Sequence, residues 1–139
     1  MLHALAALAL FAAADWGPTD AVGYWLTEDG DTVDVFACED SICGRVVASP
    51  DIDPDGPPVV DENNPDPALR DRKILGLIFI EGFKETKKGW RKGTIYDPRK
   101  GETYRSAITR TGPEELKVKG CVGPICRTLT WTATDAPAE

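Results

Sequence analysis

The chain has 139 residues, enough for one domain with an ordinary core, and carries 23 acidic against 16 basic residues for a formal net charge of −7. This charge argues against nucleic-acid binding, whose affinity comes largely from neutralised phosphates, and it gives no attraction to anionic membrane surfaces. The composition therefore favours one small acidic domain without a nucleic-acid partner.

The N-terminal stretch MLHALAALALFAAAD contains the apolar run of a secretory signal peptide at residues 4–14. This run is too short to span a bilayer, and no later segment is long and apolar enough to do so. Ala12 and Ala14 fit the small-residue rule for cleavage, which would make Asp15 the first mature residue. We therefore expect export to the periplasm or the extracellular space, and an organisation into a signal peptide at 1–14, a lead-in at 15–21, a β domain at 22–133 and a disordered tail at 134–139.

Short β-rich runs separated by turn signals fill the rest of the chain, with almost no helical periodicity. The runs cover residues 22–27, 31–37, 42–48, 74–81, 88–96, 102–110, 115–121 and 126–133. Asp, Gly and Pro supply the turn chemistry between them. Eight short strands with mostly tight connections favour an all-β, up-and-down antiparallel barrel, because closure removes exposed strand edges. A β-sandwich is the alternative.

The one long break runs from Ser49 to Lys73 and is rich in proline and acidic residues. Within it, Asp66 can cap a helix that has Pro67 at its first position. We expect a short helical turn in this loop, over one mouth of the barrel.

The four cysteines form two pairs with the same spacing, Cys38 with Cys43 and Cys121 with Cys126. In a meander the connections alternate between the two ends of the barrel, and these pairs occupy the second and the seventh connection. They therefore lie at opposite ends and cannot converge on one zinc ion. An even cysteine count in an exported chain predicts two local disulfides, Cys38–Cys43 and Cys121–Cys126.

The stretch DIDPDGPPVVDE matches the EF-hand calcium-loop pattern, with candidate ligands at Asp51, Asp53, Asp55 and Glu62. An EF-hand loop is held by two flanking helices, whereas this loop follows a strand and contains three prolines. We interpret it as a solvated acidic loop and keep it as a weak calcium candidate, so no metal site is predicted.

Several motifs in order resemble the bacterial "domain of unknown function 2147" family. They are GYWLTEDG, CGRVV, NPDPALRDRKILGL, GF, GTIYDPRKGETY and LKVKGCVGPICRTLTWT, and they extend from Gly23 to Thr132. The resemblance implies a small exported protein of Gram-negative-type bacteria with a lipocalin-like (calycin-like) barrel. It brings no established activity, so the function has to come from the site.

Gly23-Tyr24-Trp25 has the G-x-W form that lipocalins carry on their first strand, where the tryptophan closes the barrel floor and an arginine packs on it. Arg127, Leu129 and Trp131 share one face of the last predicted strand by alternation. The resemblance thus suggests floor packing by Trp25, Arg127 and Trp131. Arg127 departs from the lipocalin pattern, because it lies near the start of that strand rather than near its end.

The only histidine, His3, lies in the predicted signal peptide, and the predicted disulfides leave no thiol. Histidine-assisted nucleophilic catalysis is therefore excluded from the mature chain, and no cofactor motif is present. We expect a protein that is not an enzyme and needs no cofactor.

Two functions remain open. The first is binding of a small apolar or amphipathic molecule inside the barrel, with candidate contacts from Arg70, Trp90, Tyr96 and Tyr104. The second is a structural or interaction role in the cell envelope, with a barrel filled by its own side chains. Eight strands give a bore that permits either. The sequence leaves the ligand, the protein partners and the oligomeric state open.

Overall fold

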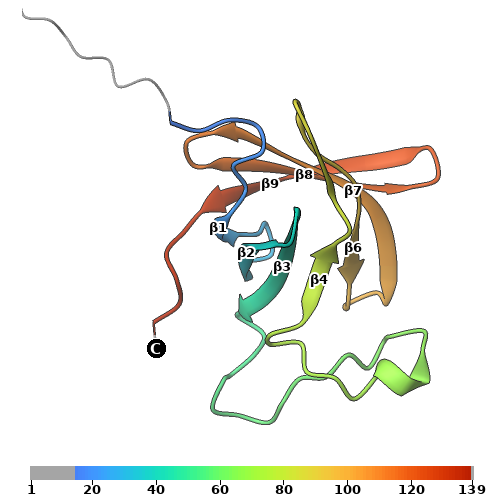
Figure 1. Cartoon of the computed structure of the whole chain (residues 1–139). Helices are drawn as coiled ribbons and strands as arrows, with labels where there is room; N and C mark the ends of the chain where they lie inside the picture. The colour runs from blue at the N-terminus through green and yellow to red at the C-terminus, as the bar shows by residue number, and fades with distance from the viewer. Residues whose placement is uncertain (1–14, 139) are drawn as a thin grey trace, which may run out of the picture.

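Alternating apolar residues and tight turns give an all-β molecule in the computed structural model, which describes residues 15–138 (Figure 1). The predicted signal peptide, residues 1–14, lies outside the described residues. The strands are β1 (Gly23–Leu26), β2 (Thr32–Cys38), β3 (Ser41–Ala48), β4 (Ile78–Glu81), β5 (Lys84–Thr86), β6 (Gly89–Asp97), β7 (Glu102–Gly112), β8 (Glu115–Val122) and β9 (Ile125–Ala133). Residues 134–138 form no regular secondary structure.

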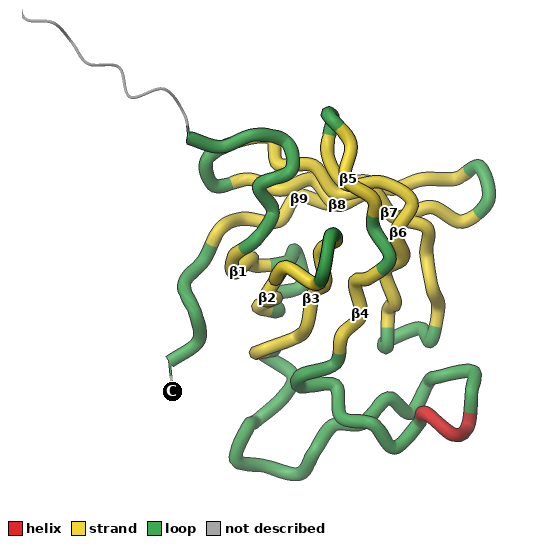
Figure 2. The backbone as a smooth tube through the Cα atoms, viewed as in Figure 1, coloured by secondary structure: helices red, strands yellow, loops and turns green. Residues whose placement is uncertain are grey.

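The strands form one antiparallel sheet in the order β4-β3-β2-β1-β9-β8-β7-β6-β5, and a further pairing of β4 with β6 closes it. The predicted eight-stranded, up-and-down barrel is thereby confirmed, since β5 only extends the β6 hairpin beyond the closed wall (Figure 2). The fourth strand begins at Ile78 rather than at residue 74. Ile74 and Leu77 are instead buried in a small separate cluster with Val46.

The long connection between β3 and β4, residues 49–77, lies across one end of the barrel (Figure 1). It contains the predicted helical turn, Pro67–Leu69, whose N-cap Asp66 accepts the backbone N–H of Ala68 at 3.0 Å. We call this connection the long loop, and the barrel end beneath it the mouth. In the described part of the chain no helix has the length and apolarity needed to cross a membrane.

The opposite end of the barrel, the floor, is closed by the lead-in at residues 15–21. The indole N–H of Trp25 donates to the carbonyl of Ala21 at 2.8 Å, and that of Trp90 donates to the carbonyl of Thr19 at 2.9 Å. Both tryptophans and Ala21 are buried in the main core. The lead-in is therefore tied to the barrel by the polar ends of two otherwise apolar side chains.

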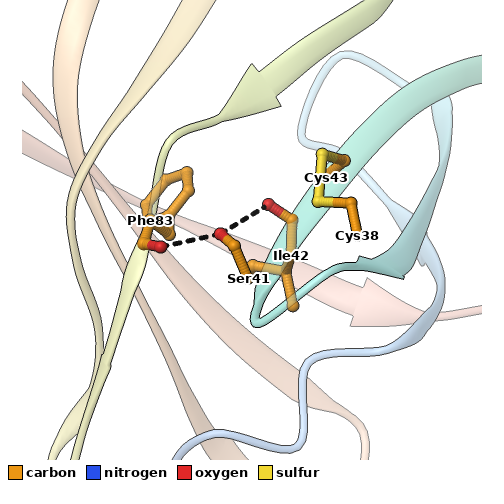
Figure 3. Close-up of a disulfide and its surroundings, with 5 residues drawn as sticks. All are labelled: Cys38, Ser41, Ile42, Cys43 and Phe83. Atoms are coloured by element: carbon orange, nitrogen blue, oxygen red, sulfur yellow. Dashed lines mark hydrogen bonds between the residues drawn. A yellow bond between two sulfur atoms is a disulfide. The ribbon is translucent and has the colours of Figure 1, made fainter.

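The two predicted disulfides are confirmed. Cys38–Cys43 spans the β2–β3 turn and Cys121–Cys126 spans the β8–β9 turn, and the described residues contain no free cysteine. Beside the first disulfide, the Ser41 hydroxyl donates to the carbonyl of Phe83 at 2.7 Å (Figure 3). This bond joins the β2–β3 turn to the segment between β4 and β5 at the floor.

Candidate functional site

The floor half of the barrel is packed with its own side chains, whereas the mouth half is hollow. A cavity of about 680 Å³ opens at the mouth, where the β1–β2, β3–β4 and β6–β7 connections meet. The apolar side chains of its barrel wall come from six strands and are Val33, Val46, Phe79, Ile95, Val118, Leu129 and Trp131. Because side chains alternate along a strand, a closed barrel turns one apolar set from each strand toward its axis.

Trp131 and Phe79 form the deep part of the cavity wall. Their ring centroids lie 6.4 Å apart at 39°, and Trp131 is only 2% exposed. Phe79 contacts both the main core and the cluster beneath the long loop. These two rings therefore separate the open cavity from the packed floor.

A buried carboxylate holds the long loop against β6. Asp61 is fully buried and accepts hydrogen bonds from the Tyr96 hydroxyl at 2.6 Å, the Asn64 amide at 2.8 Å and Arg72 Nε at 2.8 Å. The backbone N–H of Asp61 also donates to the carbonyl of Arg72 at 2.9 Å. A buried charge with three donors and a paired cation satisfies the conditions under which burial is tolerated.

The same network shifts two pKa values in opposite directions. Burial alone would raise the pKa of Asp61, but hydrogen bonds from Tyr96, Asn64 and Arg72 outweigh it and lower that pKa below its ordinary value of 3.8. Burial and the adjacent Asp61 carboxylate raise the pKa of Tyr96 to about 12. At neutral pH the pair is therefore a carboxylate that accepts from a neutral phenol.

At the end of the same strand β6, Arg99 of the β6–β7 turn binds the neighbouring connections together. Its guanidinium donates to both carboxylate oxygens of Asp31, at 3.0 and 3.1 Å, and to Asp51 at 3.3 Å. Asp29 lies 4.0 Å away. The hydrogen bonds to Asp31 raise the pKa of Arg99 further above its ordinary value, despite partial burial. The bidentate pairing with Asp31 and the bond to Asp51 together join three connections around one cation.

The cavity thus has an apolar interior and a polar rim. Among the rim residues, Tyr104 donates from its hydroxyl to Glu102 at 2.6 Å, which with burial raises the pKa of Tyr104 to about 12. The Arg127 side chain lines the cavity on the same face of β9 as Leu129 and Trp131, and it makes no hydrogen bond or ion pair with any described residue. An apolar pocket with a few polar groups at its entrance is typical of small-molecule sites.

Only two of the four residues predicted to contact a ligand line the cavity. Tyr96 and Tyr104 line the cavity, whereas Arg70 and Trp90 do not. Arg70 is exposed on the long loop and donates from Nε to the carbonyl of Asn64 at 2.7 Å. Trp90 lies at the floor end of β6, where its indole contacts the lead-in. A bulge between Trp90 and Gly93 then changes which side chains of β6 turn inward toward the mouth.

Floor packing also differs from the expectation. Trp25 and Trp131 are both buried in the main core, but Arg127 is exposed at the mouth, near the start of β9. The cation over Trp25 is Arg110 of β7, whose guanidinium carbon lies 5.7 Å from the ring centroid. Arg110 Nη1 also donates to the carbonyl of Asp20 at 3.0 Å, so it fixes the lead-in as well as the ring.

The calcium-loop residues do not assemble into a ligand set. Asp51 is paired with Arg99, and Asp53 accepts the backbone N–H of Asp55 at 2.9 Å. Glu62 lines the cavity. Within residues 15–138, no three acidic, histidine or cysteine side chains converge as a metal site would require.

Sequence reasoning missed Asp61 and Arg99, and of the two arginines that could face the mouth, Arg70 and Arg72, it chose Arg70. Asp61 and Tyr96 lie 35 residues apart, and Arg99 and Asp31 lie 68 residues apart. No local pattern signals such pairs. The motif NPDPALRDR was recognisable as a specific feature of the long loop, but its spacing does not tell which of its two arginines turns inward.

Comparison with known proteins agrees with this architecture. The solved structure of protein HP1028 from Helicobacter pylori, described as belonging to the lipocalin family, matches with a TM-score of 0.74 at 21% identity and covers 84% of each chain. At that identity the likeness shows the fold alone, a lipocalin-like barrel. A search of curated proteins gives no match. The family model described as "Uncharacterized protein conserved in bacteria (DUF2147)" matches residues 23–133, so the chain belongs to this bacterial family, as its motifs indicated.

Proposed function

We propose that the protein binds one small apolar or amphipathic molecule inside the barrel. The observation that carries this proposal is the cavity of about 680 Å³, which lies within the usual range for ligand pockets of roughly 300–1,000 Å³. Its deep wall of Trp131 and Phe79 suits an apolar group, and its rim of Tyr104, Arg127 and charged residues suits a polar one.

Two features support a preformed rather than a collapsed cavity. The Asp61 network and the Arg99 cluster hold the long loop at two separate places on the rim. At the other end, Trp25, Trp90 and Arg110 close the floor without entering the cavity. A site that is already open avoids the free-energy cost of reorganisation when a ligand binds.

We further propose that the protein acts by binding rather than by catalysis, and that it acts after export. The rim carboxylates Asp31 and Asp51 are paired with Arg99, which suits a structural role better than proton transfer. The signal-like segment and the two disulfides are both compatible with export. Cell fractionation with N-terminal sequencing of the mature protein tests the compartment, with Asp15 expected as the first residue.

Binding is tested with N-phenyl-1-naphthylamine, a neutral apolar fluorophore. We expect saturable binding to one site, with quenching of tryptophan fluorescence because Trp131 lines the cavity. Leu129→Trp should weaken binding by placing a bulky ring inside the cavity. Thr103→Trp is the matched control, because Thr103 is exposed on β7 and does not line the cavity. Equal binding by both variants, or no saturable binding to the wild type, would reject an internal site.

A further inference from the structure

The N-terminal part of β9, residues 125–130, has a neighbouring strand on one side only. β1 pairs with β9 at Trp25↔Ala133 and Leu26↔Thr132, and the pairing ends there. β8 pairs with β9 along its whole length. In Figure 1 the β8–β9 hairpin extends away from the barrel, toward the right. We call the unpaired side of residues 125–130 the β9 edge.

The register shows which backbone groups point out of the β9 edge. The N–H of Ala133 donates to the carbonyl of Glu114 on the β8 side, so odd-numbered residues of β9 turn their N–H toward β8. Cys121 and Cys126 face each other with Cα atoms 4.1 Å apart, the spacing of a pair whose own N–H and C=O groups point outward. The N–H and C=O groups of Cys126 and Thr128 therefore face outward, and no described strand pairs with them.

The next outward N–H, that of Thr130, confirms this alternation. It donates to the Glu28 carboxylate at 2.8 Å, at the position where a longer β1 would have supplied a carbonyl. Glu28 therefore marks one end of the β9 edge, and the Gly123-Pro124 turn marks the other. The disulfide between Cys121 and Cys126 holds the hairpin together where β1 gives no support.

The charge of this hairpin is opposite to that of the whole chain. Residues 116–131 contain Lys117, Lys119 and Arg127 and no acidic residue, in a chain with a formal net charge of −7. Lys119 lies opposite Thr128 in the register and is exposed, and Arg127 is exposed on the other face. At the tip, Val122 and Ile125 are 59% and 76% exposed. A strand added to the β9 edge would thus meet cations on both faces and apolar side chains at the tip.

We propose that the β9 edge takes an extended, acidic segment of another protein as an added antiparallel strand. Backbone hydrogen bonds to Cys126 and Thr128 would supply the pairing, and Lys119 and Arg127 would select acidic side chains. A second copy of this chain fits less well, because pairing two β9 edges brings like charges together, and lysine at an edge opposes such self-pairing. The inference does not rest on the proposed ligand, although Arg127 lies both on the rim of the cavity and beside the β9 edge.

Amide hydrogen exchange measured by NMR tests the proposal, with the synthetic peptide TEVEVET as the probe. In the free protein the Cys126 and Thr128 amides should exchange fast, while the Arg127 and Leu129 amides are protected by β8. At saturating peptide, exchange at Cys126 and Thr128 should slow at least about tenfold, with Arg127 and Leu129 unchanged. The peptide TEPEPET has the same charge but cannot form a strand, and it should give no protection.

Two variants separate strand addition from simple charge attraction. Thr128→Pro removes an outward N–H that no described residue accepts, so the fold should persist and peptide binding should be lost. Thr128→Ala keeps the amide and should bind as the wild type does. The proposal is overturned if Thr128→Pro binds TEVEVET normally, or if TEPEPET protects the Cys126 and Thr128 amides as well as TEVEVET does. It is also overturned if these two amides are already protected in the free protein and the protection rises with protein concentration, because a second copy of the chain would then occupy the edge.

Discussion

Replacing Asp61 with alanine should destabilise the whole domain, although the residue lies in a loop. The change removes the acceptor of three hydrogen bonds, from Tyr96, Asn64 and Arg72, inside a fully buried site. Hydrogen bonds to a charged group contribute about 1.5 kcal/mol or more each, which gives roughly 4–5 kcal/mol for three. The Arg72 side chain is 35% exposed, so water can solvate it after the change and reduce the net cost to about 3 kcal/mol.

The loss should be global because the long loop also buries Ile74 and Leu77 against Val46 of β3. Urea unfolding at neutral pH, followed by tryptophan fluorescence, measures the free energy of unfolding. Asp71→Ala is the matched control, since Asp71 is an exposed acid of the same loop that pairs with no described residue, and its change should stay within about 0.5 kcal/mol. A loss below about 1 kcal/mol for Asp61→Ala would refute the reasoning.

The pH dependence gives a second test of the same carboxylate. The pKa of Asp61 in the folded protein lies below its ordinary value of 3.8, so the unfolded chain binds a proton first as the pH falls. The stabilisation is therefore complete above the unfolded value and is lost as the pH falls through the folded pKa. The difference in unfolding free energy between wild type and Asp61→Ala should be constant down to about pH 5 and shrink below it. A difference that is unchanged at still lower pH would contradict the assignment.

Three further predictions follow from individual contacts. Gly93→Ala should lower the free energy of unfolding in urea by about 1–3 kcal/mol, because its Cβ would lie 2.3 Å from the Phe83 ring. Gly120→Ala, whose Cβ would lie 3.6 Å from its nearest neighbour, should lower it by less than about 1 kcal/mol, and similar losses for both variants would contradict this. Arg110→Ala should lower the free energy of unfolding by about 2 kcal/mol, because it removes contacts with Trp25 and three backbone carbonyls. Arg127→Ala at the mouth should change it by no more than about 0.5 kcal/mol, and a larger loss for Arg127 than for Arg110 would contradict the assignment of Arg110 to the floor. Isothermal titration should detect no calcium binding tighter than about millimolar, since Asp51 is paired with Arg99, and a micromolar affinity abolished by Glu62→Gln would overturn this.

The strand segments, the tight turns and the two disulfides could be predicted because each depends on a local signal, and closure followed from the need to leave no exposed strand edge. Alternation of apolar residues within a strand, turn residues between strands and the repeated cysteine spacing are all readable over a few positions. The capped turn at Asp66 and Pro67 was predictable for the same reason. The first strand of the barrel and its core tryptophan also follow from a local motif.

Only the tertiary structure decided which side chains face the cavity and which cations pair. Alternation assigns faces within a strand, but a bulge resets it, and the one after Trp90 includes Lys92 at a positive φ of 60°. The stagger between strands then places Arg110 rather than Arg127 over Trp25. The rim pairs join residues dozens of positions apart, and the β9 edge exists only because β1 ends early. These features result from packing across the whole barrel, so no short stretch of sequence specifies them.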